Sequence, residues 1–320
     1  MSCQTKENPD FEDIGILPDP PINPMNKYTK EKYELGKALF FEPRLSQNNT
    51  ISCGSCHQPD KGWTDHEERS FGHDEQTGKR NAMTILNTAY TDKLFWDGRA
   101  INLEHQAMFP IADPVEMNEK LPIAIRKIKD FPKYKNLFSK AFGNDQINMQ
   151  NLQKAIAVFE RTIISPKTKF DKFISGESEI YSDSELRGLH LFRTKAQCIN
   201  CHNTGYFSDN KFHNDGLTHL GTKHEDLGLY YVTKIEADKG KFKTPTLREI
   251  SKTGPWMHTG FFKDLEGVVD YYNLGNPMPV GKSYFENDAN REVPNKSEML
   301  TKLNLSDQEK TDLLNFLETL

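Results

Sequence analysis

SCGSCHQPDKGW, residues 52–63, holds two cysteines three positions apart, with a histidine directly after the second. These residues are Cys53, Cys56 and His57. The pattern returns as CINCH at residues 198–202, with Cys198, Cys201 and His202. The chain has five cysteines, and four of them lie in these two motifs. The repetition indicates that the chain performs the same covalent or metal chemistry in two places.

Three kinds of chemistry use closely spaced cysteines. A structural zinc site gathers its ligands within a few tens of residues, whereas these motifs lie in opposite halves of the chain. A thioredoxin-like redox pair needs a βαβ context and no adjacent histidine. In c-type haem attachment, each thiol adds to a haem vinyl group and the adjacent histidine binds the iron. The pattern therefore predicts two covalently bound c-type haems, with His57 and His202 as iron ligands.

The bulk composition is that of an ordinary globular protein. Of the 320 residues, 36% are hydrophobic and 27% are charged, so no disordered class is indicated. The net charge is −5, and lysine and arginine are scattered, which argues against nucleic-acid binding. No stretch approaches the roughly 18 apolar residues of a transmembrane helix, and no signal peptide is visible. The length predicts two domains or one large one.

Helical periodicity occurs before and after each motif. The four segments are residues 27–41, 151–164, 182–192 and 305–320. Ser182 and Ser306 each precede a glutamate by three residues, a pattern typical of a capping box. The long segments 58–110 and 203–280 are rich in Gly, Pro, Asn and Asp, and no alternating run predicts a substantial sheet.

Each half of the chain therefore follows the plan of a small cytochrome c: helix, haem motif, long loop region, helix. We predict a mainly α fold of two cytochrome c-like domains, each wrapped around one haem, with long irregular loops. The polar, proline-containing segment 165–173 indicates the boundary. We expect a tail or linker over 1–22, a first domain over 23–166 and a second over 167–320.

The sequence resembles the bacterial di-haem cytochrome c peroxidases across nearly all of its length. Besides the two motifs, the matching stretches are LGKALFFEPRLS (35–46), FGHDEQTGKRNAMTILN (71–87), FWDGRAINLEHQA (95–107), PIADPVEM (110–117), KFKTPTLREI (241–250) and PWMHTGFFKDLEGVVDYY (255–272). They occur in the family's order and near its spacing. The resemblance implies that hydrogen peroxide is reduced at the first haem, in the peroxidatic domain, and that electrons enter at the second, in the electron-transfer domain.

Three residues near the first haem receive roles from this resemblance. His73 matches the removable sixth ligand of that haem, in a glycine-flanked loop that can swing away; by itself it reads as a surface loop histidine. Glu116 matches the carboxylate that takes a proton from one peroxide oxygen and delivers it to the other. Without the resemblance it would be a partly exposed turn residue. Gln106 matches a second polar residue of the same pocket.

Other matches lie between the two expected domains. Trp96 has at least a packing role, and in the family this tryptophan lies between the haems and relays electrons. Asn81, Thr253 and Pro255 match an interdomain calcium site, with two of the three acting through backbone carbonyls and the rest through water. His258 matches a position near the second haem and is interpreted as structural.

The sequence departs from the family pattern at one axial position. Standard members place a methionine after the LEEAV-like stretch as the second ligand of the electron-transfer haem, whereas this chain has Tyr272. Met257 falls in the wrong part of the pattern and Met278 lies six residues late. Leu265, Val268, Val269 and Tyr272 have helical spacing, so Tyr272 is expected to point inward. Its ring could ligate the iron or only pack on the porphyrin, and Tyr271 is the weaker candidate.

Tyrosine at this position resembles the di-haem enzyme that oxidises tryptophans during methylamine dehydrogenase maturation. Three functions are therefore open. The favoured one is a cytochrome c peroxidase supplied with electrons by a small cytochrome c or cupredoxin. The second is an oxidase that uses peroxide to oxidise a protein side chain through the tyrosine-ligated haem. The third is a non-catalytic electron-transfer cytochrome, against which Glu116 and Gln106 argue.

Location follows from the haem chemistry. Haem is attached to CxxCH outside the bacterial cytoplasm, so the protein is expected in the periplasm. Cys3, followed by a polar stretch, resembles the lipid-modified first residue of a mature lipoprotein; the alternative is a tail cysteine without a role. The resemblance also implies a possible homodimer and one bound calcium ion.

Overall fold

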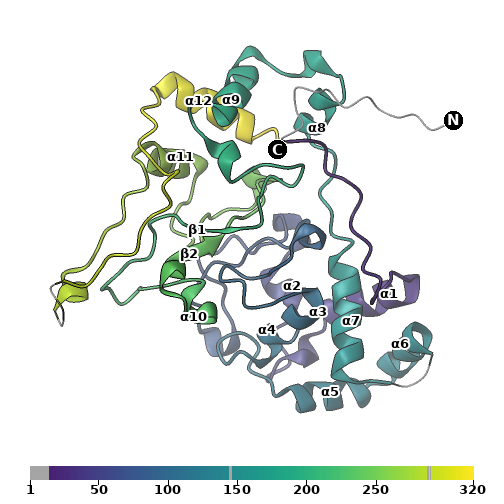
Figure 1. Cartoon of the computed structure of the whole chain (residues 1–320). Helices are drawn as coiled ribbons and strands as arrows, with labels where there is room; N and C mark the ends of the chain where they lie inside the picture. Colours follow the sequence, from purple (N-terminus) through teal and green to yellow (C-terminus); the bar gives the residue numbers. More distant parts are fainter. Residues whose placement is uncertain (1–13, 144–145, 287, 289) are drawn as a thin grey trace.

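The structure, a computed structural model, describes residues 14–143, 146–286, 288 and 290–320. Helices dominate, as predicted, and the described residues contain one two-stranded sheet (Figure 1). Strand β1 (Phe212–Asn214) pairs antiparallel with β2 (Lys241–Lys243). None of the helices in the described part of the chain has the length and apolar character needed to cross a membrane.

In the first half, α1 (Lys30–Phe40) packs against α7 (Met149–Glu160). These helices confirm the predictions over 27–41 and 151–164. Thr29 caps α1 by accepting a hydrogen bond from the Lys32 amide, which explains why the helix begins at Lys30. Two helices that the sequence did not indicate, α5 (Leu121–Lys129) and α6 (Pro132–Phe142), complete this half.

The second half repeats the arrangement with α9 (Asp183–Arg193) against α12 (Asp307–Leu317). Both helices begin with the predicted capping boxes, formed by Ser182 with Glu185 and by Ser306 with Glu309; these pairs satisfy backbone amides that the first turn leaves free. The remaining α-helices in the described residues are α2 (Cys53–Cys56), α3 (Leu103–Gln106), α4 (Phe109–Ala112), α8 (Lys169–Ile174), α10 (Tyr230–Thr233) and α11 (Leu265–Asn273).

Close backbone contact joins each helix pair. A Cβ atom on Gly36 of α1 would lie 1.9 Å from the carbonyl oxygen of Ala155, and one on Gly188 of α9 would lie 2.0 Å from that of Asp312. Only glycine permits such an approach. In both halves, therefore, a glycine on the first helix allows the two helices to pack closely.

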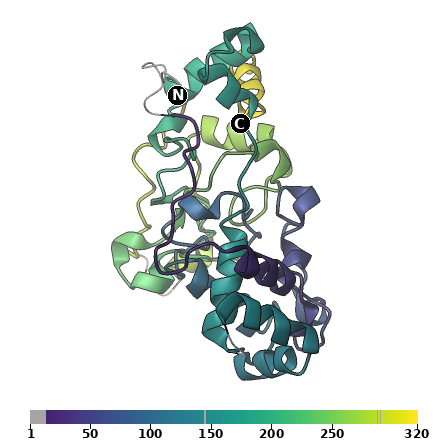
Figure 2. The ribbon, with the colours of Figure 1, turned by 90° about the vertical axis from the view of Figure 1, so that its right-hand side faces the viewer.

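The buried side chains form two main clusters. One contains residues between Leu35 and Ile163, and the other contains Ile14 together with residues between Phe170 and Leu320. The predicted boundary after residue 166 lies between them. Ile14 is fully buried in the second cluster, so the described end of the segment expected to be a tail packs on the second half before the chain runs to α1 (Figure 2).

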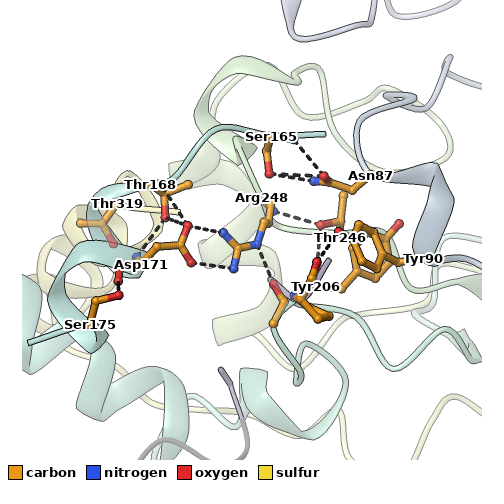
Figure 3. A network of polar contacts seen from close by, with 12 residues as sticks. Asn87, Tyr90, Ser165, Thr168, Asp171, Ser175, Tyr206, Thr246, Arg248 and Thr319 are labelled. Atoms are coloured by element: carbon orange, nitrogen blue, oxygen red, sulfur yellow. Dashed lines mark hydrogen bonds and ion pairs between the residues drawn. The ribbon is translucent and has the colours of Figure 1, made fainter. Parts of the chain in front are cut away.

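The segment between α7 and α8 is held at both ends (Figure 3). Asn87 donates a hydrogen bond to the Ser165 hydroxyl at 3.0 Å and accepts one from the Ser165 amide at 2.9 Å. Arg248 is 1% exposed and pairs with both oxygens of Asp171 at 2.7 and 2.9 Å, while its Nε donates to the Gly205 carbonyl. These contacts fix how the first half leads into the second.

Candidate active site

The second motif lines a cavity in the second half of the molecule. Cys198, Cys201 and His202 face it, together with apolar residues from α11, α12 and the 297–303 loop. His202 Nδ1 lies 3.0 Å from the Phe207 carbonyl oxygen. Because a carbonyl only accepts, Nδ1 carries the proton and Nε2 is left free as a ligand atom.

The first motif has the same local geometry. Helix α2 holds both cysteines, and His57 caps its end. His57 Nδ1 lies 3.1 Å from the carbonyl oxygen of Trp63, which again frees Nε2. Burial lowers the pKa of both His57 and His202, so each imidazole is held in the neutral form that binds metal ions.

These features test whether haem fits the two motifs. The four motif cysteines are unpaired thiols, as thioether formation requires. Each histidine has its ring oriented by a carbonyl, the usual arrangement for a metal-binding imidazole. The mainly apolar cavity at the second motif suits a porphyrin disc. The residues present fit covalent haem.

Tyr272 points into the second cavity. Leu265, Val268, Val269 and Tyr272 all line it, so the predicted inward face of α11 is confirmed. In the described part of the chain the Tyr272 hydroxyl makes no hydrogen bond, whereas that of Tyr271 donates to the carbonyls of Asp215 and Pro277, at 3.0 Å each. Burial, with a smaller contribution from Asp215, raises the pKa of Tyr272 well above its usual value, so a phenolate there needs a bound cation.

Methionines also lie around this cavity. Met257 and Met299 are among its lining residues, and Met278 is not. Met299 is 38% exposed and Met257 lies in a loop with φ of 66°. Met278 packs instead against the separate cluster of Leu220, Leu227 and Tyr284.

The loop that contains His73 (the His73 loop) packs against the turn that contains Glu116 (the Glu116 turn). The His73 amide donates to the Glu116 carbonyl at 2.7 Å, and a Cβ on Gly72 would lie 1.9 Å from the Val115 carbonyl oxygen. His73 Nδ1 is buried without a partner among the described residues, and Nε2 lies 3.3 Å from an Asp74 carboxylate oxygen. The sequence-predicted ligand and the sequence-predicted carboxylate are thus brought together.

Glu116 is half-buried, and its environment favours the protonated form. Burial raises the pKa of this carboxyl to about 7, Asp113 adds to the rise and Arg99 opposes it. Burial also raises the pKa of Cys56 to about 11, and the Glu116 charge contributes to that rise, which indicates that the carboxylate lies near the first motif. Gln106 ends α3 half-buried, and its side-chain amide forms no hydrogen bond with the described residues.

Trp96 lies where the two halves meet. It is 8% exposed and lines the second cavity, although it belongs to the first half. Its indole Nε1 donates to the Asn81 carbonyl at 2.9 Å, and its own carbonyl accepts from the Lys243 amide at 2.8 Å. Its ring is T-shaped to that of His258 at 6.2 Å between centroids. His258 in turn stacks on Phe242, 3.5 Å between centroids.

The three residues matched to a calcium site, Asn81, Thr253 and Pro255, all line this cavity. The Asn81 carbonyl already accepts the Trp96 indole, and its side-chain Nδ2 donates to the Glu67 carbonyl at 3.0 Å. The side-chain oxygen of Asn81 is therefore the atom of that residue better placed for a hard cation.

Sequence reasoning missed an ionic connection between the halves. Arg80 pairs with Asp226 at 2.7 and 2.8 Å and with Asp97 at 2.6 Å. Asp97 also accepts from Arg99, the cation that opposes the pKa rise of Glu116. The signal was present in FWDGR, where two charges follow the tryptophan, but the partner in the other half of the chain could not be identified from spacing.

Comparison with known proteins bears on this site. Residues 30–179 match the family described as di-haem cytochrome c peroxidase. The chain is 36% identical over 96% of its length to the cytochrome-c peroxidase IdrP1 of Pseudomonas sp. (strain SCT), covering 85% of that protein. It belongs to the di-haem cytochrome c peroxidase family. Like its relatives, this di-haem peroxidase-family protein is an oxidoreductase.

Two further relatives represent both branches of the family. The chain is 40% identical over 81% of its length to the cytochrome c551 peroxidase of Nitrosomonas europaea, covering 79% of that protein. It is 37% identical over 95% of its length to the methylamine utilization protein MauG of Methylorubrum extorquens, covering 81% of it. The chain is thus similar to members of both branches over most of its length.

Solved structures confirm the fold of this family member. A MauG-like protein associated with microbial copper homeostasis superimposes with a TM-score of 0.83 at 31% identity, over 95% of this chain and 93% of that one. The di-haem peroxidase BthA of Burkholderia thailandensis gives a TM-score of 0.77 at 22% identity, over 93% and 88%. The predicted mainly α fold of two cytochrome c-like domains is confirmed.

Proposed function

We propose that the protein is a di-haem cytochrome c peroxidase that reduces hydrogen peroxide to water, using electrons from a small cytochrome c or cupredoxin in the periplasm. The observation that carries this proposal is the contact between the His73 loop and the Glu116 turn. It combines a histidine that can be displaced with a carboxyl group suited to proton transfer, beside the first motif.

The two motifs would hold the cofactors, with the peroxidatic domain over 23–166 and the electron-transfer domain over 167–320. Cys53 and Cys56 would attach the first haem and Cys198 and Cys201 the second, with His57 and His202 as the proximal ligands. Haem at the first motif would supply the redox chemistry that splits the oxygen–oxygen bond.

Glu116 would move the proton. Its pKa of about 7 means that both protonation states are populated at neutral pH. The ionised carboxylate accepts a proton from one peroxide oxygen, and the resulting acid returns it to the oxygen that leaves as water. Gln106, at the end of α3, would orient peroxide by hydrogen bonding.

His73 would control access. His73 would be able to bind the iron of a haem held at the first motif and so close this site to peroxide, and its loop would have to move for the site to open. In the described structure the His73 amide donates a hydrogen bond to the Glu116 carbonyl, which ties this histidine to the turn that carries Glu116. Movement of the loop would therefore also release the Glu116 turn, which links opening to the position of the carboxylate.

Electrons would cross between the domains through Trp96, which bridges the first half and the cavity of the second. A calcium ion at Asn81, Thr253 and Pro255 would hold the two domains in the register that this transfer requires. The proposed lipid anchor, Cys3, lies outside the described residues, and a homodimer is a further part of the proposal.

A second function is favoured by one observation. Tyr272 faces the second cavity with a free hydroxyl, and the MauG relative is as similar to this chain as the peroxidases are. A phenolate ligand would lower the potential of the second haem, which suits storage of oxidising equivalents for a protein side chain. A non-catalytic electron carrier is the third candidate, and the raised pKa of Glu116 argues against it.

The test is a steady-state peroxide assay with a reduced small cytochrome or cupredoxin as donor. The wild type should turn over, and Glu116→Gln should keep both haem spectra while losing about 10²–10⁴ in rate. Because the ionised form of Glu116 accepts the first proton, wild-type kcat/KM should fall as the pH drops below about 7.

Glu75→Gln is the matched control, since it removes an exposed carboxylate two residues from His73. It should retain wild-type turnover. Full activity in Glu116→Gln would remove this residue from the mechanism, and no donor oxidation by the wild type would favour the second or third function.

A further inference from the structure

A buried amide without a partner faces the second cavity. Asn276 is 0% exposed, and neither Nδ2 nor Oδ1 of its side chain has a hydrogen-bond partner among the described residues. Leaving such a group unsatisfied is unfavourable, so native proteins nearly always provide a partner. Asn276 lines the cavity that also contains Cys198, Cys201 and His202. Its missing partner is therefore to be sought in the group that fills this cavity.

The backbone holds Asn276 firmly in this position. Helix α11 ends at Asn273, and the Gly275 amide then donates to the Tyr272 carbonyl at 2.9 Å while the Asn276 amide donates to the Tyr271 carbonyl at 3.0 Å. These two bonds form a Schellman motif, the usual hydrogen-bonded end of a helix. Asn276 has φ of 52°, a conformation that asparagine and glycine accept better than other residues.

Neighbouring protein groups do not satisfy this amide. Tyr272 lines the same cavity, but no hydrogen bond joins it to Asn276 in the described structure. The Tyr271 hydroxyl is engaged by two carbonyls, and Asp215 accepts from the Leu217 amide at 3.0 Å. The hydrogen-bonding groups that a haem brings into such a cavity are its propionate carboxylates, and an amide N–H donates well to a carboxylate.

We propose that Asn276 is a positioning residue for the second haem, with its Nδ2 donating a hydrogen bond to a propionate. The proposal rests on the proposed function only in requiring a haem at the second motif, and it does not depend on ligation by Tyr272. A hydrogen bond to the propionate offsets negative charge at the edge of the porphyrin. It therefore favours reduced iron and raises the potential of this haem relative to one without the bond.

Two substitutions keep the unusual backbone conformation. Asn276→Gly removes the side chain, and Asn276→Asp replaces the donor with a second acceptor of the same shape. At the wild-type midpoint potential, Asn276→Gly should lower the ratio of reduced to oxidised second haem on the order of tenfold. Asn276→Asp should lower it further, because its carboxylate repels the propionate. The measurement is a spectroelectrochemical titration, with the first haem as an unshifted internal reference.

Asn304 supplies the matched control. It has φ of 54° in the same half of the molecule, is exposed and does not line the cavity. Asn304→Gly and Asn304→Asp should leave both potentials unchanged. Equal shifts in the Asn304 variants, or no shift in either Asn276 variant, would overturn the proposal.

The experiment also distinguishes this proposal from a contact with Tyr272 and from the proposed function itself. The titration is repeated in a Tyr272→Phe background, where a contact with a propionate predicts that the Asn276→Gly shift persists. Loss of the shift would assign the contact to the tyrosine and contradict the propionate assignment. A haemochrome assay giving one haem per chain would overturn the proposed function as well, whereas two haems with unshifted potentials would overturn only the role of Asn276.

Discussion

Among single residues, Tyr272 bears most on the choice between the two proposed catalytic functions, because a phenolate ligand on the second haem would favour the side-chain oxidase. The helical spacing from Leu265 onward placed Tyr272 on the cavity side, and the structure confirms that placement. It also brings Met257 and Met299 to the same cavity, which spacing along the chain did not indicate.

Tyr272→Phe should change the absorption spectrum of the second haem and raise its potential, because a phenolate stabilises ferric iron. The first haem should be nearly unaffected. The measurement is an optical redox titration of the purified variant. Tyr271→Phe is the matched control: Tyr271 does not line the cavity, and its hydroxyl bonds to the carbonyls of Asp215 and Pro277, so the substitution should cost about 1 kcal/mol of stability without altering either spectrum. An unaltered spectrum in Tyr272→Phe would point to a methionine ligand.

His73→Gly should open the first haem in the oxidised protein, giving a five-coordinate or water-bound spectrum. Peroxide should then react without prior reduction of the second haem, since the ligand that closes the site is gone. Stopped-flow absorption after mixing with peroxide measures this directly. The gating role fails if the oxidised wild type reacts as fast as the variant.

The residues that sequence reasoning did not find share a physical reason. The carbonyls of Trp63 and Phe207 orient the two proximal histidines, and backbone atoms leave no trace in residue identity. Asn276 belongs to no recognisable sequence motif. It can be identified only from the structure, where both polar atoms of its side chain lack a hydrogen-bond partner among the described residues. Tyr272 could be identified from the sequence because residues three or four positions apart lie on the same face of a helix, and its neighbours on that face are apolar.

Among the elements, the helix pairs α1–α7 and α9–α12 show which local signals are sufficient. Capping boxes and apolar periodicity predicted α9 and α12, and the structure places their starts at the expected serines. Helix α5 has Pro122 as its second residue and α6 has Pro132 as its first, and neither helix has a side-chain cap at its start. A proline near the first position predicts the start of a helix less specifically than a capping box does.

Gly188→Ala should destabilise the second domain, because its Cβ would overlap the Asp312 carbonyl oxygen at 2.0 Å. Overpacking of this kind costs about 1–3 kcal/mol, more than alanine gains in helix propensity. Thermal unfolding monitored by circular dichroism measures the loss. Gly78→Ala, whose nearest contact is 3.7 Å, should leave the melting temperature nearly unchanged. Equal melting temperatures for the two variants would show that the helix pair can relax.

For the whole molecule, the function depends on how the halves face one another, and this was the part least visible in the sequence. The repeated plan predicted two cytochrome c-like domains, and the comparisons confirm that fold. Contacts such as Arg80 with Asp226, or the Trp96 carbonyl with Lys243, join residues more than a hundred positions apart. No periodicity or spacing rule reaches across such a separation, so interdomain geometry had to come from the structure.

The most direct test of the account is the stoichiometry of turnover. Peroxide and a reduced one-electron donor are mixed with the di-haem protein, and both reactants are followed to completion. A peroxidase should oxidise two donor molecules per peroxide consumed, and this turnover should be lost in Glu116→Gln and kept in Glu75→Gln. Peroxide consumption without donor oxidation, or donor oxidation that is unchanged in Glu116→Gln, would contradict it.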